Sequence, residues 1–193
     1  MTIRQTLLLW IAALLLGCSQ PTHFNSTDIS GADWGKDFQL TDSRGQPRRL
    51  ADFKDKVVVV FFGYTQCPDV CPTTLSTMRD TLARMGDSAS RVQVVFITLD
   101  PARDGAPMLG DYVAAFHPSF IGLYGDEATT AATAKDFKVF YSKHPGSSPD
   151  SYSIDHSTSS YAFDPQGRLR LLIRHGDTPE NIAADLKRLL AGK

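Results

Sequence analysis

The chain has 193 residues, of which 42% are apolar and 21% charged, and its formal net charge is −1. Its 20 Lys and Arg residues are balanced by 21 Asp and Glu residues, which argues against a nucleic-acid-binding protein. The apolar content argues against a disordered chain, and three cysteines are too few for a disulfide scaffold. A chain of this length can bury a full hydrophobic core without disulfides.

Residues 1–17 are predicted to be a signal peptide. Arg4 supplies a positive charge, and the apolar run of residues 7–16 is too short to span a bilayer. The run ends at Cys18 in a sequence that resembles a bacterial lipoprotein signal, in which this cysteine carries the lipid. The alternative is an uncleaved signal anchor. Both interpretations place the rest of the chain in an exported compartment, where disulfides persist.

Residues 18–34 are polar and irregular, and we expect them to form a flexible tether between the lipid and a domain of residues 35–193. A β-hairpin is predicted at the start of this domain, over residues 38–50. The continuous apolar run of residues 57–62 is typical of a central strand that is buried on both faces.

The rest of the domain alternates helices and strands. Helices are predicted to begin at Pro72, Pro107, Asp126 and Thr178, and strands are predicted over residues 92–99, 120–124, 160–163 and 169–173. Residues 142–153 are predicted to be a polar loop. This order predicts an α/β fold with a mixed central sheet flanked by helices. Its antiparallel hairpin and last helix are typical of a thioredoxin-like fold, here with an extra N-terminal β-hairpin.

Cys67 and Cys71 lie at the carboxyl end of the strand over residues 57–62, where open α/β sheets form their sites. On a helix, two residues at this spacing share a face and lie about 6 Å apart along the axis. A disulfide tolerates that distance, and both sulfurs can also face one metal ion. A helix N-terminus lowers the pKa of nearby thiols, which favours the thiolate. A structural disulfide, a redox dithiol and a metal site all remain open.

A metal site needs a further ligand, and His156 is the best candidate among the histidines. It precedes the strand over residues 160–163, and in a thioredoxin-like fold the loop before this strand passes beside the cysteine turn. The other histidines are expected in loops or facing solvent: His23, His117, His144 and His175. Two thiolates and one imidazole suit copper(I), copper(II) or zinc. A structural zinc normally has four protein ligands, so three ligands indicate a metal that is taken up and given away.

Three segments resemble motifs of the Sco (SenC/PrrC) family. They are residues 63–72 (GYTQCPDVCP), residues 98–104 (TLDPARD) and residues 155–157 (DHS). The resemblance covers residues 35–191 and implies a membrane-tethered copper chaperone in the bacterial periplasm. It implies delivery of copper to, or reduction of, the dinuclear copper site of cytochrome c oxidase subunit II. The implied ligands of one Cu(I) or Cu(II) ion are Cys67, Cys71 and His156.

The residues around these ligands are candidates for supporting the site or for docking a partner: Asp69, Asp100, Arg103, Asp104 and Asp155. A turn role for Asp69 and a loop or helix-capping role for Asp100, Arg103 and Asp104 are the alternatives. With a lipid on Cys18, the expected location is the periplasmic side of the inner membrane.

A protein of this kind is not expected to be an enzyme. Further expected partners are periplasmic copper carriers and thiol reductants, and no nucleic acid is expected. The alternative function is a thiol–disulfide oxidoreductase that acts on cysteines of a copper-accepting partner. A peroxiredoxin-like peroxidase is a third hypothesis.

Overall fold

The computed structural model describes residues 23–147 and 151–193. The predicted signal peptide and Cys18 lie outside the described residues, so both stay predictions. Within the described part, no helix is long and apolar enough to cross a membrane.

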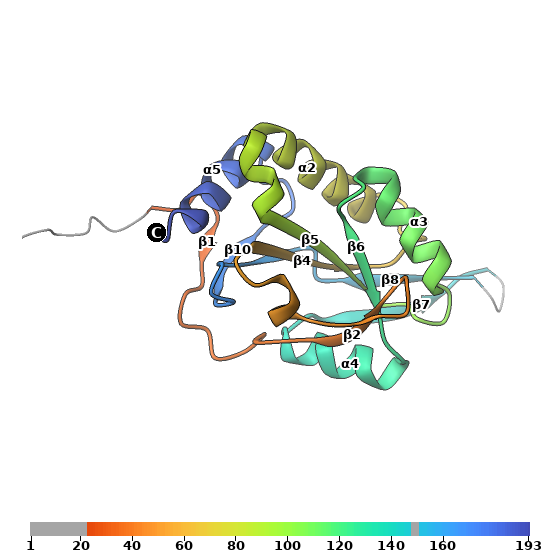
Figure 1. The fold of residues 1–193 in the computed structure, drawn as a ribbon. Coiled ribbons are helices and arrows are strands. Elements are labelled where there is room, and N and C mark those ends of the chain that lie inside the picture. Colours follow the sequence, from red (N-terminus) through yellow and green to blue (C-terminus); the bar gives the residue numbers. More distant parts are fainter. Residues whose placement is uncertain (1–22, 148–150) are drawn as a thin grey trace, which may run out of the picture.

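The described elements alternate along the chain much as the sequence predicts (Figure 1). The strands are β1 (Thr27–Asp28), β2 (Gln39–Asp42), β3 (Pro47–Arg49), β4 (Val57–Gly63), β5 (Val92–Thr98), β6 (Ile121–Tyr124), β7 (Tyr141–Pro145), β8 (Tyr152–His156), β9 (Ser160–Phe163) and β10 (Leu169–Ile173). The helices are α2 (Val70–Met85), α3 (Ala106–Phe116), α4 (Glu127–Asp136) and α5 (Pro179–Leu190), with 3-10 turns η1 (Leu50–Phe53) and η2 (Gly86–Arg91).

An eight-stranded mixed sheet forms the centre of the domain, in the order β1-β10-β9-β4-β5-β6-β2-β3. Strands β4, β5 and β6 are parallel, and β9 is antiparallel to β4. The hairpin of β2 and β3 closes one edge of the sheet next to β6. The predicted α/β class, with its mixed central sheet and N-terminal hairpin, is therefore confirmed.

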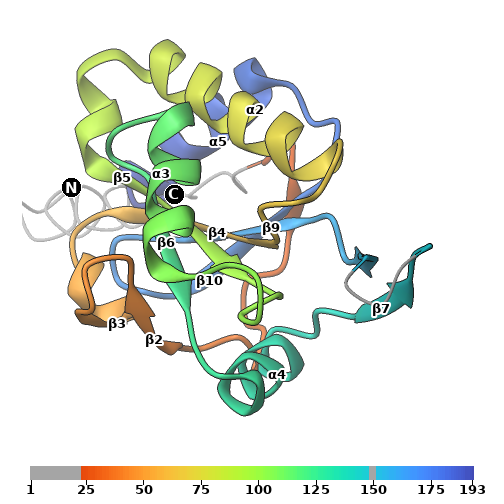
Figure 2. The ribbon, with the colours of Figure 1, turned by 90° about the vertical axis from the view of Figure 1, so that its right-hand side faces the viewer.

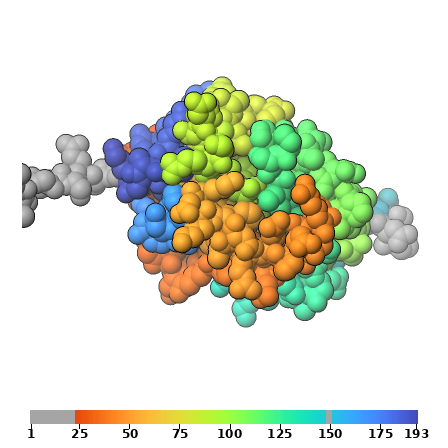
Figure 3. Space-filling view, viewed as in Figure 1, coloured from red at the N-terminus to blue at the C-terminus, as the bar shows by residue number. Residues whose placement is uncertain are grey.

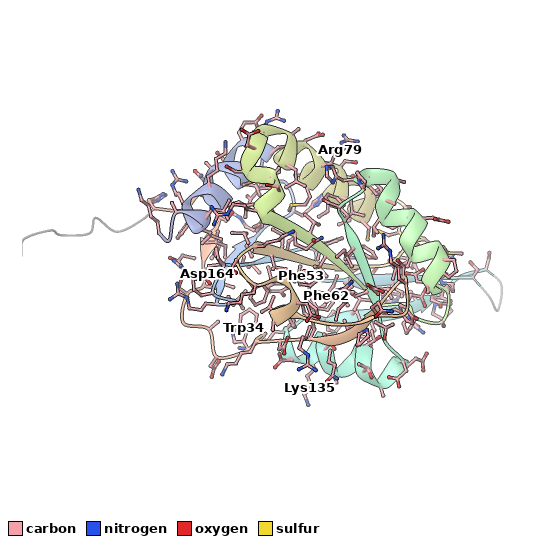
Figure 4. All side chains as sticks on the ribbon, viewed as in Figure 1. Trp34, Phe53, Phe62, Arg79, Lys135 and Asp164 are labelled. Carbon is pink, nitrogen blue, oxygen red and sulfur yellow. The ribbon has the colours of Figure 1, made fainter. Side chains whose placement is uncertain are left out.

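Strand β4 is buried along its whole length because helices cover both faces of the sheet. Its residues alternate between two core clusters: Val57, Val59 and Phe61 face one, and Val58, Val60 and Phe62 face the other. Helices α2, α3 and α5 cover the first face and α4 the second (Figure 1). The labelled side chains of Phe62 and Trp34 lie on the side of α4 (Figure 4).

Two of the predicted helix starts, at Asp126 and Thr178, are found with their caps. The Asp126 carboxylate accepts a hydrogen bond from the Thr129 amide at the start of α4 (2.7 Å). The Thr178 hydroxyl accepts one from the Asn181 amide at the start of α5 (3.3 Å). Gly86 ends α2 with a φ of 59°, a backbone conformation that favours glycine. The face shown in Figure 3 presents the segment from β2 to η1 at its centre, with α2 above it and α3 beside it.

The predicted polar loop over residues 142–153 is wrong, because residues 142–145 and 152–153 lie in the two strands of a β-hairpin. Strands β7 and β8 pair from Tyr141 with His156 to Pro145 with Tyr152. They form a separate two-stranded sheet, which extends from the body of the domain as an arm (Figure 2). The sequence of the arm has no apolar alternation because much of both strands is solvent-exposed and only Ile154 is buried.

The segment expected to be a flexible tether joins the domain before residue 35. Phe24 is buried, and β1 pairs with β10 at the edge of the sheet. The buried Asp185 carboxylate accepts hydrogen bonds from the amides of Asn25 (3.0 Å) and Ser26 (2.8 Å). The polar sequence of this segment does not indicate its packing. Much of its attachment comes from backbone amides that donate to the distant Asp185 carboxylate.

Candidate metal centre

Three side chains that can bind a metal come together at the carboxyl end of β4. The sulfurs of Cys67 and Cys71 and a ring nitrogen of His156 all lie within 4.8 Å of one another. The Cys71 sulfur lies 3.5 Å from His156 Nε2. Both cysteines are free thiols; Cys71 is buried, whereas Cys67 and His156 are partly exposed. The structure thus brings together the three residues that the sequence analysis selected as ligands.

The turn between β4 and α2 positions the two sulfurs. The Cys67 amide donates to the Tyr64 carbonyl (3.3 Å), which closes the turn before the helix. Helix α2 begins at Val70, so Cys67 lies in the turn and only Cys71 lies on the helix. The Cys71 amide donates to the Cys67 sulfur (3.4 Å). Convergence of the sulfurs therefore comes from this folded turn, and not from two helical positions on one face.

His156 ends strand β8 and reaches the thiols from the arm. Its Nδ1 lies 2.9 Å from the Ser157 carbonyl oxygen, which can only accept a hydrogen bond. Nδ1 therefore carries the proton, and Nε2 directs its lone pair towards the sulfurs. Burial lowers the pKa of His156, which favours the neutral imidazole that a metal requires.

The Cys71 thiol does not have the lowered pKa that the start of a helix would produce. Burial raises the pKa of Cys71, and its hydrogen bond with Cys67 acts in the same direction. Desolvation of a thiolate inside the apolar core outweighs the helix N-terminus here. The expectation of a stabilised thiolate is wrong at Cys71. This thiol keeps its proton until a metal ion displaces it.

The three donors fit a metal ion that prefers soft or borderline ligands. Two sulfurs and one imidazole nitrogen are a donor set for copper or zinc and not for magnesium or calcium. Among the described residues, this group contains no fourth Cys, His, Asp or Glu. The set is therefore smaller than that of a closed structural zinc site.

The other histidines lie outside this group. His117 Nδ1 lies 2.8 Å from the Ser119 hydroxyl, and exposed His175 lies 3.4 Å from the Thr74 hydroxyl. His144 pairs with Asp155 across the arm at 3.2 Å, and both side chains are exposed. His23 is exposed.

Among the predicted supporting residues, Asp104 and Asp100 are fully buried and Arg103 is largely so. Asp104 accepts hydrogen bonds from the Thr65 amide (3.0 Å), the Thr65 hydroxyl (2.6 Å) and the Thr98 hydroxyl (2.6 Å). It thereby joins the end of β5 to the turn that carries Cys67. Exposed Asp69 has only a local contact, because its carboxylate accepts a hydrogen bond from the Thr73 hydroxyl (3.3 Å).

Sequence reasoning missed two tyrosines that connect the arm to the segments around the site. The Tyr64 hydroxyl accepts a hydrogen bond from the Ile154 amide (3.3 Å). The Tyr152 hydroxyl donates to Asp100 (2.6 Å). Tyr64 lies within the motif of residues 63–72, so its place there was the available signal. Tyr152 gives no such signal, since its partner is 52 residues away.

A large cavity of the domain lies away from the candidate ligands. A cavity of about 490 Å³ lies at the other end of β4, where its lining includes Phe53, Val58 and Asp164. Phe53 and Asp164 are labelled in Figure 4. None of the three candidate ligands lines this cavity. At the candidate metal centre, the ligand Cys67 is partly open to solvent.

Comparisons with known proteins identify relatives over most of the chain. The family model described as SCO1/SenC matches residues 26–191. The mitochondrial SCO2 homolog of Mus musculus is 35% identical over 157 residues, which are 80% of this chain and 62% of the mouse protein. The chain thus spans about six tenths of the length of that relative.

Solved structures show the same fold. A copper-bound ScoI from Bradyrhizobium japonicum is 40% identical with a TM-score of 0.73, covering 79% of this chain and 97% of the other. A SCO1/SenC family lipoprotein from Bacillus anthracis is 26% identical with a TM-score of 0.71, covering 86% and 99%. These likenesses confirm the thioredoxin-like fold. The fold brings two cysteines and a histidine together, and the family model matches residues 26–191. This chain therefore belongs to the SCO1/SenC family.

Proposed function

We propose that this chain binds one copper ion through Cys67, Cys71 and His156 and serves the assembly of cytochrome c oxidase. In this proposal it delivers copper to the dinuclear copper site of subunit II, or keeps the thiols of that site reduced. The observation that carries the proposal is the convergence of the three donor atoms within 4.8 Å. Membership of the SCO1/SenC family and the copper-bound Bradyrhizobium relative support copper as the metal.

The proposed ligands have different roles in holding and releasing the ion. Bound copper would supply the positive charge that lets both thiols lose their protons. Buried Cys71 and the oriented His156 ring hold the ion from the protein side. Cys67 is partly exposed, so thiols of a partner can approach the ion there and replace one ligand at a time. The ion can then leave without unfolding of the domain.

Two exposed apolar side chains next to the site support contact with a protein partner. Met108 is 51% exposed, and its sulfur lies 3.6 Å from the hydroxyl of Thr65 in the cysteine turn. Phe140 is 71% exposed and pairs through its backbone with Ser157, the neighbour of His156. Among the described residues, these two are the exposed large apolar side chains. Their position next to the segments that carry the ligands favours docking over the metal.

A copper titration of the purified exported part tests the proposal. Wild type is expected to bind one equivalent and to develop a sulfur-to-copper(II) charge-transfer band. Cys67→Ser and His156→Ala are expected to lose this band. His144→Ala is the matched control, because this exposed histidine lies on the same arm outside the group and should leave the band intact. Reduced wild type that binds no copper would overturn the proposal.

Copper binding is also expected to release the proton of Cys71 and to tighten as the pH rises. The raised pKa of Cys71 means that the metal-free thiol is protonated at pH 7, and this proton competes with the ion. Because burial lowers the pKa of His156 below its usual 6.5, the imidazole adds no such competition at pH 7. Each thiol proton that the ion displaces makes the affinity rise about tenfold per pH unit.

Calorimetry in buffers of different ionisation enthalpy measures this release. Cys71→Ser should release one proton fewer than wild type on any residual binding. Affinity that stays constant between pH 6 and pH 8 would contradict the expected competition.

The thiol–disulfide oxidoreductase remains a second candidate because the two sulfurs differ in exposure. Partly exposed Cys67 would attack a partner disulfide as the thiolate, and a mixed disulfide would form while one partner thiolate leaves. Cys71 would then lose its proton and attack Cys67, which releases the partner as a dithiol and leaves a Cys67–Cys71 disulfide. His156→Ala separates the two functions, since it removes a copper ligand and leaves thiol exchange nearly unchanged.

We further propose that residues 1–17 are a signal peptide and that a lipid on Cys18 holds the domain at the periplasmic face of the inner membrane. The lipobox-like sequence supports this location, and the Bacillus relative is itself a lipoprotein. Cys18→Ser should abolish incorporation of labelled fatty acid. Unchanged labelling in this variant would refute lipidation at Cys18.

A further inference from the structure

One guanidinium group contacts both segments that carry the candidate ligands. Arg103 Nη1 donates to Oε1 of Gln66, the residue before Cys67 (3.1 Å). The same nitrogen donates to the carbonyl oxygen of Tyr152, at the start of the strand that ends with His156 (3.0 Å). Arg103 therefore bridges the cysteine turn and the arm, which are far apart in the sequence.

A buried carboxylate fixes the guanidinium in this place. Asp100 is fully buried and forms an ion pair with Arg103 Nε. Its other oxygen accepts the hydrogen bond from the Tyr152 hydroxyl (2.6 Å). The Tyr152 ring also lies against the guanidinium, with Arg103 Cζ 3.5 Å from the ring centroid. Asp100, Arg103 and Tyr152 form a closed cluster, which we call the arm clamp.

The arm needs such an anchor because its two strands pair only with each other. They form a separate sheet, with no strand of the main sheet beside them. Besides the clamp, the arm contacts the cysteine turn through the hydrogen bond from the Ile154 amide to the Tyr64 hydroxyl and through the His156 ring, which lies edge-on to the Tyr64 ring. An isolated two-stranded hairpin is marginally stable in water. The position of His156 therefore depends on contacts at the base of the arm.

We infer that Arg103, held by Asp100 and Tyr152, is a positioning residue that presets His156 against the two thiols before the metal arrives. The inference rests on the proposed copper function and adds to it a group that touches no metal. Loss of the clamp lets the arm leave the thiols for part of the time. The measured affinity then falls with the fraction of molecules in which all three ligands are in place.

Arg103→Lys tests the clamp and keeps the positive charge opposite Asp100. A lysine cannot hydrogen-bond to Asp100, Gln66 and Tyr152 with one planar group, nor stack on the ring in the same way. The expected copper affinity is about ten- to a hundredfold lower, as for other residues that orient metal ligands. The nitrogen hyperfine coupling from His156 in the copper(II) resonance spectrum should weaken while both sulfurs stay bound. In the metal-free protein, the Ile154 amide should exchange its hydrogen faster.

Arg168→Lys is the matched control. Arg168 pairs with Asp164, another buried carboxylate, which follows β9 at the end away from His156 (Figure 4). This control should leave copper affinity, the spectrum and Ile154 exchange as in wild type. Should Arg103→Lys fail to fold, Tyr152→Phe removes only the hydroxyl that reaches Asp100 and is expected to shift the same three readouts in the same direction.

The outcomes separate this inference from the proposed function. Wild-type affinity, spectrum and exchange in the folded Arg103→Lys or Tyr152→Phe protein would overturn the clamp and leave the copper function in place. A lower melting temperature without a change in the nitrogen coupling would also overturn it, since that result describes a purely structural pair. A wild-type protein that binds no copper would instead refute the proposed function, while faster Ile154 exchange in Arg103→Lys would still support the clamp.

Discussion

Replacing Asp104 with alanine is expected to lower the free energy of unfolding by about 3 kcal/mol, because a buried carboxylate with several donors is lost. Its oxygens accept one amide and two hydroxyl hydrogen bonds, from Thr65 and Thr98. Those donors lie at the junction of β5 and the cysteine turn, and the alanine leaves them without an acceptor. Urea denaturation measures the loss.

The same substitution is expected to weaken copper binding, because Thr65 lies two residues before Cys67. Asp155→Ala is the control, since this carboxylate is 74% exposed and its removal should change stability by less than about 0.5 kcal/mol. A folded Asp104→Ala protein with the stability and copper affinity of wild type would show that this carboxylate supports neither the turn nor the site.

Replacing Gly63 with alanine is expected to destabilise the domain by about 2 kcal/mol and to displace the Cys71 thiol. A Cβ at this position would lie 2.8 Å from the Cys71 sulfur and 2.9 Å from the ring of Phe96. Both neighbours are fully buried, so neither can move without repacking the core. Glycine is thus needed here for close approach between the end of β4 and the first turn of α2.

Thermal unfolding and copper affinity measure the two effects of Gly63→Ala together. Gly105→Ala is a suitable control, because its Cβ would meet no atom within 4 Å and its φ of −64° suits any residue. The control should show a much smaller change. Equal stability and equal copper affinity in both variants would contradict the tight packing around Cys71.

Much of the fold could be predicted because its signals are local. The apolar run of residues 57–62 predicts a strand that is covered on both faces. The structure has this strand as β4, which is buried throughout. Asp126 and Thr178 mark helix starts through hydrogen bonds that span three residues. Cys67 and Cys71 are separated by three residues, so their proximity follows from the chain itself.

The features that could not be predicted depend on contacts between distant residues. The arm of β7 and β8 has no apolar pattern, and Asp100 and Arg103 hold it from across the site. The packing of residues before position 35 depends on Asp185, which lies 160 residues from its partner Asn25. The raised pKa of Cys71 comes from burial of its thiol. The sequence indicates only that the thiol lies near the start of a helix, which by itself would lower the pKa.

X-ray absorption at the copper edge tests the central claim most directly, because it counts the atoms bound to the ion. We expect two sulfur neighbours and one imidazole nitrogen in the wild-type protein loaded with one equivalent of copper. In His156→Ala the two sulfurs should remain and the imidazole scattering should disappear. A wild-type ion surrounded only by oxygen and nitrogen, or a spectrum that His156→Ala leaves unchanged, would contradict a site built from these three residues.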